Sequence, residues 1–493
     1  MDPEEFRRAG HQLIDWIADY RTGLADGPVL AVTAPGEVAA GFETEPPGAV
    51  STMESMLGQL ESRVVPGVTQ VQHPMHFGWF PSNAALSSVL GDIASSGLGN
   101  LGISWESCPA LTEIEEVMCD WMRQLTGLSQ DWTGTIQDTA STACLVALLC
   151  ARERATEHSQ AGGGLGAVER PPVVYTTAQA HSSVKKAALL AGFGGDNLVL
   201  VEVDPVSYSM DPNRLASLMA ADVAAGRNPA AVVASVGSTG VTAFDPLGPI
   251  TEVAAKYDAW VHVDAAMAGT AMLLPECRHL WEGVEQADSL TWNPHKWMGT
   301  ILDTSLYYVK DPEHLVRVMS TNPSYLRSTS DGEVTQYRDW GLPLGRRFRA
   351  LKLWFHLELD GLDAIRARIR RDLENARWLA DQVQASQDWE LVAPVTLQTV
   401  CVRHHLKKSG PKNQDPEALD EHTLRWVYAI NSSGAAYLTP SILDRSWMAR
   451  VSVGVESTER HHVEQLWDLM QAAAAESATQ FGAADPTGEV SHG

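Results

Sequence analysis

A lysine in apolar and aromatic surroundings is the first residue of this sequence that could do covalent chemistry. Lys296 lies within residues 293–297 (NPHKW), with Trp292 and Met298 close by. Apolar neighbours disfavour the charged form of an amine, and the neutral amine is the nucleophile that forms a Schiff base with a carbonyl compound. A solvated surface lysine is the ordinary alternative. The aromatic neighbours of Lys296 favour the interpretation as a Schiff-base lysine.

A carboxylate at the end of a hydrophobic run is the second candidate. Asp264 follows the apolar start of WVHVDAA (residues 260–266). Burial of a carboxylate is costly unless it meets a cation or a hydrogen-bond donor. The protonated pyridine nitrogen of pyridoxal 5′-phosphate (PLP) is such a donor, and the resulting ion pair lets the ring accept electrons. The competing interpretation is an aspartate that caps a following helix.

A third segment, residues 138–141 (DTAS), opens a predicted helix that runs through Leu145 to Ala151. Small hydroxyl residues and N–H groups at a helix N-terminus bind phosphate, and the helix dipole favours an anion there. The same residues are also everyday helix caps. Residues 237–239 (GST) could add polar contacts at the end of another predicted strand. Each segment alone is weak evidence, whereas the three together predict a PLP site.

The elements that must position these residues alternate between helices and short β-branched runs from about residue 82 to 350. Strands that are apolar on both faces and separated by helices indicate a parallel or mixed sheet covered on both sides, which is an α/β core. We expect strands over residues 173–177, 198–203, 230–239, 260–266 and 304–309, and helices over 213–225, 249–257 and 351–359.

The flanking regions have different patterns. Helix-like spacing of apolar residues predicts two N-terminal helices, over residues 6–21 and 53–64, in a layer that packs on the rest of the chain or on a partner subunit. The last residues lack a sustained apolar stripe, as in a frayed or disordered tail. The predicted division is an N-terminal helical segment (1–81), a large α/β domain (82–360), a small α+β domain (361–475) and a tail (476–493).

Composition excludes several classes of function. The 493 residues carry a formal net charge of −25, with 61 acidic against 36 basic side chains, which argues against nucleic-acid binding. The start is acidic without an apolar run behind it, unlike a signal peptide, and no stretch has the roughly 18 apolar residues of a membrane span. Six scattered cysteines without C-x-x-C pairs fit a reducing compartment, so we expect a cytoplasmic protein.

Three further motifs are set aside. The glycines of residues 97–102 (GLGNLG) match a dinucleotide-binding fingerprint, but no strand precedes them and no helix opens from them. Ser182 and Lys185 form an S-x-x-K pattern without the S-D-N and K-T-G companions of serine acyl-enzymes. The histidine pairs at 73/76 and 461/462 lack further ligands at metal-binding spacing, so no metal is expected.

Long motifs in a fixed order connect the chain with a known family. It resembles the aromatic L-amino acid decarboxylases, a PLP-dependent group that includes DOPA, tyrosine and tryptophan decarboxylases. The likeness runs almost end to end, through HPMHFGWFPSN, ISWESCPALTEIEEVMCDW, QAHSSVKKA, HVDAAMAG, NPHKWM and YRDWGLPLGRRFRALKLW. The resemblance implies the fold type I of PLP-dependent transferases (aspartate aminotransferase-like) and a homodimer with shared active sites.

The resemblance also assigns roles to individual residues. Lys296 is expected to bind the cofactor covalently, Asp264 to pair with the pyridine nitrogen, and His181 to stack on the ring near the substrate carboxylate. The residues expected to complete the cofactor site are Thr139, Ala140 and Ser141 at the phosphate, Thr239 and Ala266 beside the ring, and Asn293 and His295 in support of the lysine. Asp138 and Thr139 stand where many relatives have Gly and Ser.

Decarboxylation ends with protonation of the substrate Cα. The polar segment 327–337, which contains Gly332, has the composition of a mobile lid. The resemblance makes Tyr337 the lid residue that supplies the proton, whereas a surface tyrosine packed beside Trp340 is the alternative. Relatives with Phe at that place, or with Asn instead of the stacking histidine, tend to form an aldehyde, so Tyr337 and His181 predict simple decarboxylation.

The side-chain pocket of the family comes from HPMHFGWFPS and from residues 101–103, the latter contributed by the other subunit. No arginine in these segments could receive an acidic side chain, so an aromatic substrate is predicted and the choice among Trp, Phe, Tyr and DOPA stays open. An aldehyde synthase, another PLP activity and a non-catalytic protein of the same fold are the alternatives. The expected pocket residues are Val71, Trp79, Phe80, Pro81, Ser82, Leu101 and Ile103.

Overall fold

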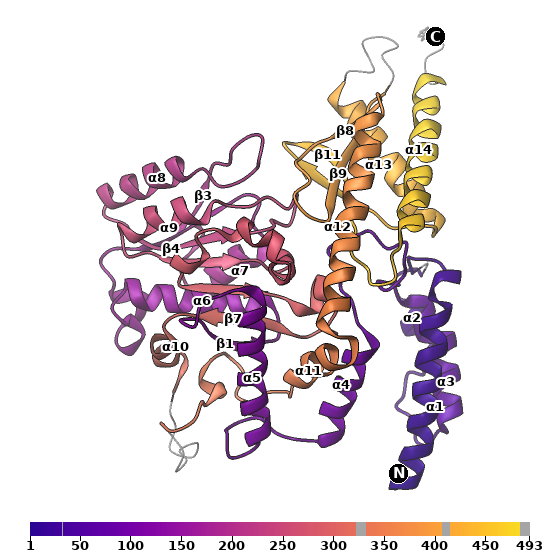
Figure 1. Cartoon of the computed structure of the whole chain (residues 1–493), viewed down its shortest axis with the longest axis horizontal. Coiled ribbons are helices and arrows are strands. Elements are labelled where there is room, and N and C mark those ends of the chain that lie inside the picture. Colours follow the sequence, from indigo (N-terminus) through magenta and orange to yellow (C-terminus); the bar gives the residue numbers. More distant parts are fainter. Residues whose placement is uncertain (32, 322–331, 407–414, 484–493) are drawn as a thin grey trace. The chain divides into compact units, whose positions relative to one another are not determined.

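The computed structural model describes residues 1–31, 33–321, 332–406 and 415–483 (Figure 1). The chain forms two compact units. The first contains Met1–Pro81, Asp381–Glu390 and Val402–Gly493, and the second contains Ser82–Ala380 and Leu391–Cys401.

The second unit is built on a seven-stranded sheet with the order β1-β7-β6-β5-β4-β2-β3. Only β7 runs against its neighbours, β1 and β6, and all other pairs are parallel. The strands are β1 (Thr133–Gln137), β2 (Pro172–Thr177), β3 (Leu198–Val201), β4 (Asn228–Ser235), β5 (Trp260–Asp264), β6 (Ser289–Trp292) and β7 (Ser305–Val309).

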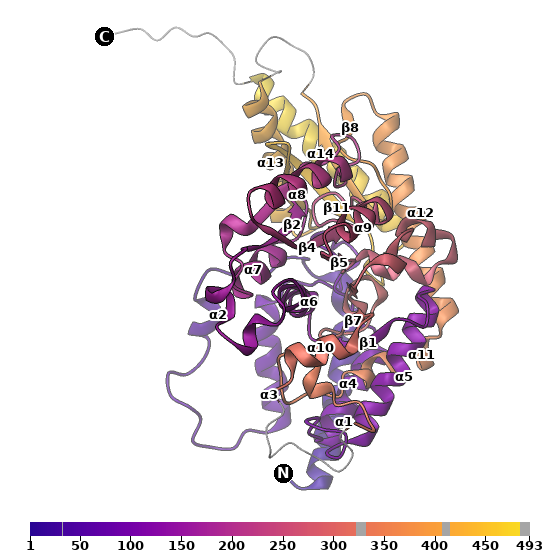
Figure 2. The ribbon, with the colours of Figure 1, turned by 90° about the vertical axis from the view of Figure 1, so that its left-hand side faces the viewer.

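Helices cover the sheet because its central strands are apolar on both faces. Every residue of β2, β5, β6 and β7 is buried, as expected for strands between two helical layers. Helix α6 packs against five of the strands and against α7 (Figure 2). The helices are α4 (Leu86–Leu98), α5 (Pro109–Thr126), α6 (Ala140–Ala155), α7 (Ser182–Leu190), α8 (Pro212–Ala224), α9 (Leu247–Ala255), α10 (Pro312–Met319), α11 (Ala350–Asp360) and α12 (Leu362–Ala385).

The first unit combines N-terminal and C-terminal segments. Its first helix starts with a capping box, in which the Asp2 side chain accepts the Glu5 N–H and the Glu5 side chain accepts the Asp2 N–H. The helices are α1 (Pro3–Thr22), α2 (Glu37–Ala40), α3 (Met53–Gln59), α13 (Pro416–Ser433) and α14 (Arg460–Ala483). The four-stranded sheet has the order β10-β11-β9-β8, with β8 (Trp389–Leu391), β9 (Thr399–His404), β10 (Thr439–Leu443) and β11 (Ser446–Ser452).

The predicted fold class is confirmed, since the core is a mostly parallel α/β sheet between helices. Each of the five expected strands is present, although most are shorter than predicted. The prediction missed β1 and β6, whose short sequences TGTIQ and SLTW carry few β-branched apolar residues. None of the described helices combines the length and apolarity needed to cross a membrane.

Two boundaries differ from those expected. The small domain was predicted to begin at residue 361, but residues 361–380 belong to the second unit. Asp372 of α12 explains this, because it accepts the indole N–H of the buried Trp297 at 2.9 Å. The tail was predicted from residue 476, but α14 continues to Ala483, so residues 476–483 are helical instead. Buried Ser477, bonded to His422 at 2.8 Å, anchors this extension.

Candidate active site

The carboxyl ends of six of the seven strands lie along one edge of the large sheet. Strands β2, β3, β4, β5 and β6 are parallel, and β1 points the same way because β1 and β6 are both antiparallel to β7. Loops at the carboxyl ends of such strands commonly form binding sites. The predicted residues that follow these strands are Thr139 after β1, His181 after β2, Thr239 after β4, Ala266 after β5 and Lys296 after β6.

Lys296 lies in a tight turn, Pro294–Met298, and has non-helical dihedral angles (φ −100°, ψ −114°). Its backbone N–H donates to the Asn293 carbonyl at 3.0 Å, and its side chain is half-buried. The turn is held from behind, since Arg368 donates to the carbonyl of the buried Trp297 at 2.7 Å. The apolar setting inferred from the sequence is therefore present, and the backbone that carries the amine is fixed.

Asn293 and His295 support this turn. Asn293 Oδ1 accepts the Ser305 hydroxyl at 2.6 Å, and its N–H donates to the Ala266 carbonyl at 2.9 Å. The Thr304 N–H donates to His295 Nδ1 at 3.0 Å. Burial, followed by the positive charge of Lys296, lowers the pKa of His295 to about 4, so its ring is neutral near pH 7.

Asp264 ends β5 and has 8% of its surface exposed. Its Oδ1 accepts the Ala266 N–H at 3.0 Å. Across the described ranges, no Lys, Arg or His lies within ion-pair distance of this carboxylate. A buried carboxylate in this state needs a cationic or donor group from outside the chain.

His181 is the N-cap residue of α7. Its Nδ1 accepts the Ser183 N–H at 3.2 Å and lies 2.8 Å from the Ser183 hydroxyl. Burial and then the positive charge of Lys296 lower the pKa of His181, while the negative charge of Asp264 raises it. The structure therefore brings these three predicted residues close enough to interact electrostatically. With Nδ1 as an acceptor, the neutral ring carries its proton on Nε2.

The predicted phosphate segment caps α6. Thr139 is the N-cap, and its Oγ1 accepts the Thr142 N–H at 3.5 Å, a long contact. The first N–H groups of a helix have no acceptor within it and can bind an anion. Ser141 and His181 line one pocket of about 360 Å³, which joins the helix start to the expected ring-stacking residue.

The loop after β4 approaches the residues that follow Asp264. A side chain at Gly237 would lie 2.4 Å from Ala268 Cβ, and its φ is +83°, so this position requires glycine. Ser238 is buried and its hydroxyl accepts the Ala243 N–H at 3.0 Å, whereas Thr239 is exposed. The turn thus presents Thr239, and not Ser238, as the side chain accessible to a ligand.

A family model described as the pyridoxal-dependent decarboxylase conserved domain matches residues 35–405. The chain belongs to this decarboxylase family. The "Tryptophan decarboxylase 2" of Oryza sativa is 35% identical over 480 residues, which cover 96% of this chain and 95% of the relative. The "Phenylacetaldehyde synthase" of Arabidopsis thaliana is 36% identical over 487 residues, which cover 96% and 97%.

Solved structures of family members have the same fold. The Oryza sativa TDC crystallised with PLP and tryptamine superposes with a TM-score of 0.93 at 35% identity, covering 97% of this chain and 99% of that one. The Rhodiola rosea 4-hydroxyphenylacetaldehyde synthase gives a TM-score of 0.89 at 30% identity, with coverages of 97% and 99%. This decarboxylase is accordingly a PLP-dependent enzyme of fold type I.

The chemistry of the donor set fits PLP. Asp264 supplies a buried acceptor without a protein cation, as a protonated pyridine nitrogen requires. The start of α6 offers N–H and hydroxyl donors for the phosphate. Lys296, on its anchored turn, supplies the amine for the aldehyde. The roles of these residues stay predictions, which the variants proposed below test.

The predicted substrate-pocket residues fall in both units. In the first unit, the Trp79 ring packs edge-on against Tyr437, with centroids 5.1 Å apart, and the Arg450 guanidinium lies 4.2 Å from the Phe80 ring centroid. Val71 is half-buried and Pro81 is buried. In the second unit, Ser82 and Ile103 are half-buried and Leu101 is 59% exposed.

Tyr337, the predicted proton donor of the lid, lies in the core of the second unit. Residues 327–331 of the proposed lid lie outside the described residues, and Tyr337 belongs to the core with 5% exposure. Its hydroxyl donates to the Gly134 carbonyl at 3.2 Å, and its ring packs edge-on against Trp340 at 5.4 Å. Burial, followed by the charge of Cys119, raises its pKa. Tyr337 therefore packs beside Trp340, as the alternative interpretation has it, but it does so in the core and not on the surface.

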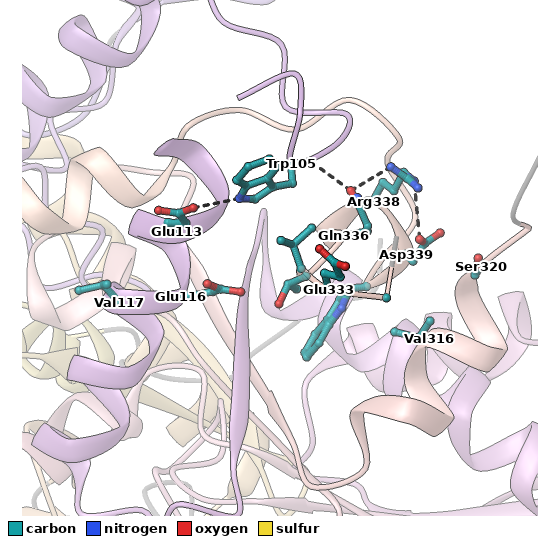
Figure 3. Close-up of a pocket in the computed structure, with 14 residues that line it drawn as sticks. Trp105, Glu113, Glu116, Val117, Val316, Ser320, Glu333, Gln336, Arg338 and Asp339 are labelled. Atoms are coloured by element: carbon teal, nitrogen blue, oxygen red, sulfur yellow. Dashed lines mark hydrogen bonds and ion pairs between the residues drawn. The ribbon is translucent and has the colours of Figure 1, made fainter. Parts of the chain in front are cut away.

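A separate cavity of about 850 Å³ lies beside this segment (Figure 3). Gln336 Oε1 accepts the Trp105 N–H at 3.0 Å and the Arg338 guanidinium at 2.9 Å, and the Trp105 indole donates to Glu113 at 3.0 Å. Among its described lining residues are none of the predicted cofactor residues. This cavity is therefore distinct from the predicted cofactor site.

Several residues that orient the site were not predicted from the sequence. Ser183 fixes the His181 ring, Ser305 holds Asn293, and Asp372 holds Trp297. Ser183 could have been found as part of a helix start, because a residue two positions after an N-cap has a free N–H. Asp372 lies 75 residues from Trp297 on an unrelated helix, and nothing local in the sequence indicates that contact.

Proposed function

We propose that this enzyme decarboxylates an aromatic L-amino acid to the corresponding amine and CO2, with PLP bound to Lys296. The observation that carries the proposal is the meeting of Lys296, Asp264 and His181 at one edge of the sheet, where the charges of the first two act on the third. Such a cluster of titratable groups with specific charge partners is typical of a catalytic site.

The chain's own residues divide the work as follows. PLP, when bound, supplies an electron sink for the bond that breaks at Cα. Asp264 would keep the ring nitrogen protonated, and Thr139, Ala140 and Ser141 would hold the phosphate. The Lys296 amine would hold the cofactor covalently. His181, neutral with its proton on Nε2, orients the substrate carboxylate and adds no positive charge that would retain it.

An aromatic substrate is supported by the composition of the expected pocket segments and by the relatives. Trp79 and Phe80 are aromatic, and the relatives of highest similarity include tryptophan and tyrosine decarboxylases. An acidic substrate would need a cation for its side chain; residues 71–82 and 101–103 contain no Lys or Arg, and burial lowers the pKa of both His73 and His76.

We also propose a cytoplasmic homodimer whose active sites contain residues of both subunits. Exposed apolar side chains support an interface, because large apolar groups in one region commonly mark contacts between subunits. Those of α4 and the loop after it are Leu86, Leu90, Ile93, Leu98 and Leu101. Size-exclusion chromatography with light scattering should give a dimer, and a fully active monomer would contradict this part of the proposal.

The proposed activity is tested by incubating the PLP-loaded enzyme with L-Trp, L-Phe, L-Tyr, L-DOPA and L-Glu and identifying the products by mass spectrometry. We expect amine and CO2 from at least one aromatic substrate and none from glutamate. The second candidate, an aldehyde synthase, is favoured by the similarity to the Arabidopsis thaliana and Rhodiola rosea enzymes. Equimolar peroxide and ammonia with aldehyde as the main product would replace the decarboxylase assignment by that one.

A further inference from the structure

Asp138 introduces a carboxylate at the mouth of the expected phosphate site. It lies directly after β1, between Gln137 and the N-cap residue Thr139. Its Oδ1 accepts the Thr139 N–H at 2.7 Å. One backbone donor at the start of α6 is therefore already bound to a side chain of the protein.

The charge of the Asp138 carboxylate should affect the binding of a phosphate at the start of α6. A phosphate monoester carries between one and two negative charges near neutral pH, so a neighbouring carboxylate repels it. The groups that line the pocket beside Ser141 include His181, whose pKa is lowered by burial, and the cation Lys186 of α7. Among the described residues no acid pairs with Lys186 within ion-pair distance, so its positive charge is available to an anion in this pocket, whereas the carboxylate of Asp138 repels one.

We propose that Asp138 is a positioning residue that weakens cofactor binding, because it takes the Thr139 N–H and repels the phosphate. The enzyme then exchanges PLP more readily than the same chain with a neutral residue at this position. This inference rests on the proposed function, since it takes the phosphate to lie at the start of α6.

The test compares Asp138→Asn with the wild type and with Asp131→Asn. Asparagine keeps an oxygen that accepts the Thr139 N–H and removes only the charge. Asp131 is exposed and precedes β1 at the opposite edge of the sheet, so its variant controls for net charge. Equilibrium dialysis should give roughly tenfold tighter PLP binding for Asp138→Asn and little change for Asp131→Asn. Asp138→Gly, which also frees the Thr139 N–H, should bind PLP at least as tightly as Asp138→Asn.

A second readout does not depend on activity. The 31P resonance of the bound cofactor reports protonation of its phosphate, and a nearby negative charge favours the protonated form. The 31P titration midpoint should therefore move to lower pH in Asp138→Asn. Unchanged affinity and an unchanged 31P titration in this variant would overturn the inference. Failure of the proposed function would look different, because the wild type itself would then bind no PLP on Lys296.

Discussion

Two regions of the second unit contain residues that the sequence predicts to be catalytic, but the structure places these residues differently. Asp264 ends the buried strand β5 and Lys296 lies in the turn after the buried strand β6, and the register of the sheet places both at one edge. Tyr337 lies in a polar segment between α10 and α11. It is buried in the core, where its hydroxyl donates to the carbonyl of Gly134, a residue distant in sequence. The difference teaches that a residue at a strand end is placed by the fold itself, whereas a residue in a connection is placed by its partners.

The largest effect is expected from removing the amine of Lys296 at the edge of the sheet. Lys296→Ala should lower kcat by on the order of 10⁴-fold or more, since no other amine follows β6 on the anchored turn. The protein should still fold, because the contacts that hold the turn come from its backbone and from Trp297. Borohydride reduction and mass spectrometry should find the cofactor on Lys296 in the wild type and unattached in the variant. A labelled residue elsewhere would contradict the site.

The second prediction concerns the buried carboxylate. Asp264→Asn keeps the shape and the acceptor for the Ala266 N–H but removes the charge that stabilises a protonated ring. We expect kcat to fall by about 10²- to 10³-fold, the cost of losing one preorganised electrostatic group. Asp264→Glu should recover part of the rate. If Asp264→Asn turned over normally while PLP stayed bound, the role assigned to this carboxylate would be wrong.

Physical reasons explain which parts could be predicted from the sequence. Five of the seven strands of the large sheet could be predicted from runs of β-branched apolar residues. The active-site motifs lie at the ends of strands, so the sheet topology also indicates where these residues lie. Asp372 and Gly134 contact their partners across 75 and 203 residues of sequence, and no local pattern encodes such contacts. For the same reason the burial of Tyr337 could not be predicted, whereas the residues at the strand ends lie along one edge of the sheet.

The third prediction sharpens the contrast by comparing two tyrosines. Because the Tyr337 hydroxyl is bound to Gly134, Tyr337→Phe should keep amine as its main product and lose about 0.5–1.5 kcal/mol of unfolding free energy. The other tyrosine of the connection, Tyr325, lies outside the described residues. If a tyrosine of this connection protonates Cα, Tyr325→Phe should shift the product toward aldehyde. Product ratios by mass spectrometry decide, and aldehyde from Tyr337→Phe would restore the original assignment.

The smallest expected effect concerns the pH dependence of stability and a buried histidine of the first unit, His422. His422 Nε2 lies 2.8 Å from His404 Nδ1, and its Nδ1 lies 2.8 Å from the Ser477 hydroxyl. Burial, followed by the charge of His404, lowers the pKa of His422 from 6.5 to about 4. The unfolded chain therefore binds a proton that the folded chain refuses, so the stability contributed by neutral His422 is complete above pH 6.5 and declines as the pH falls toward 4.

Replacing this histidine should flatten the acid side of the stability profile. His422→Gln should lose less unfolding free energy between pH 7 and pH 5 than the wild type does, by on the order of 1–2 kcal/mol, because the side chain of His422 is fully buried. Urea denaturation at both pH values measures this difference. His11→Gln, at an exposed position of α1, is the matched control and should keep the wild-type slope. Equal slopes in all three proteins would show that His422 is protonated as easily in the folded as in the unfolded chain, and that its partners do not hold it neutral.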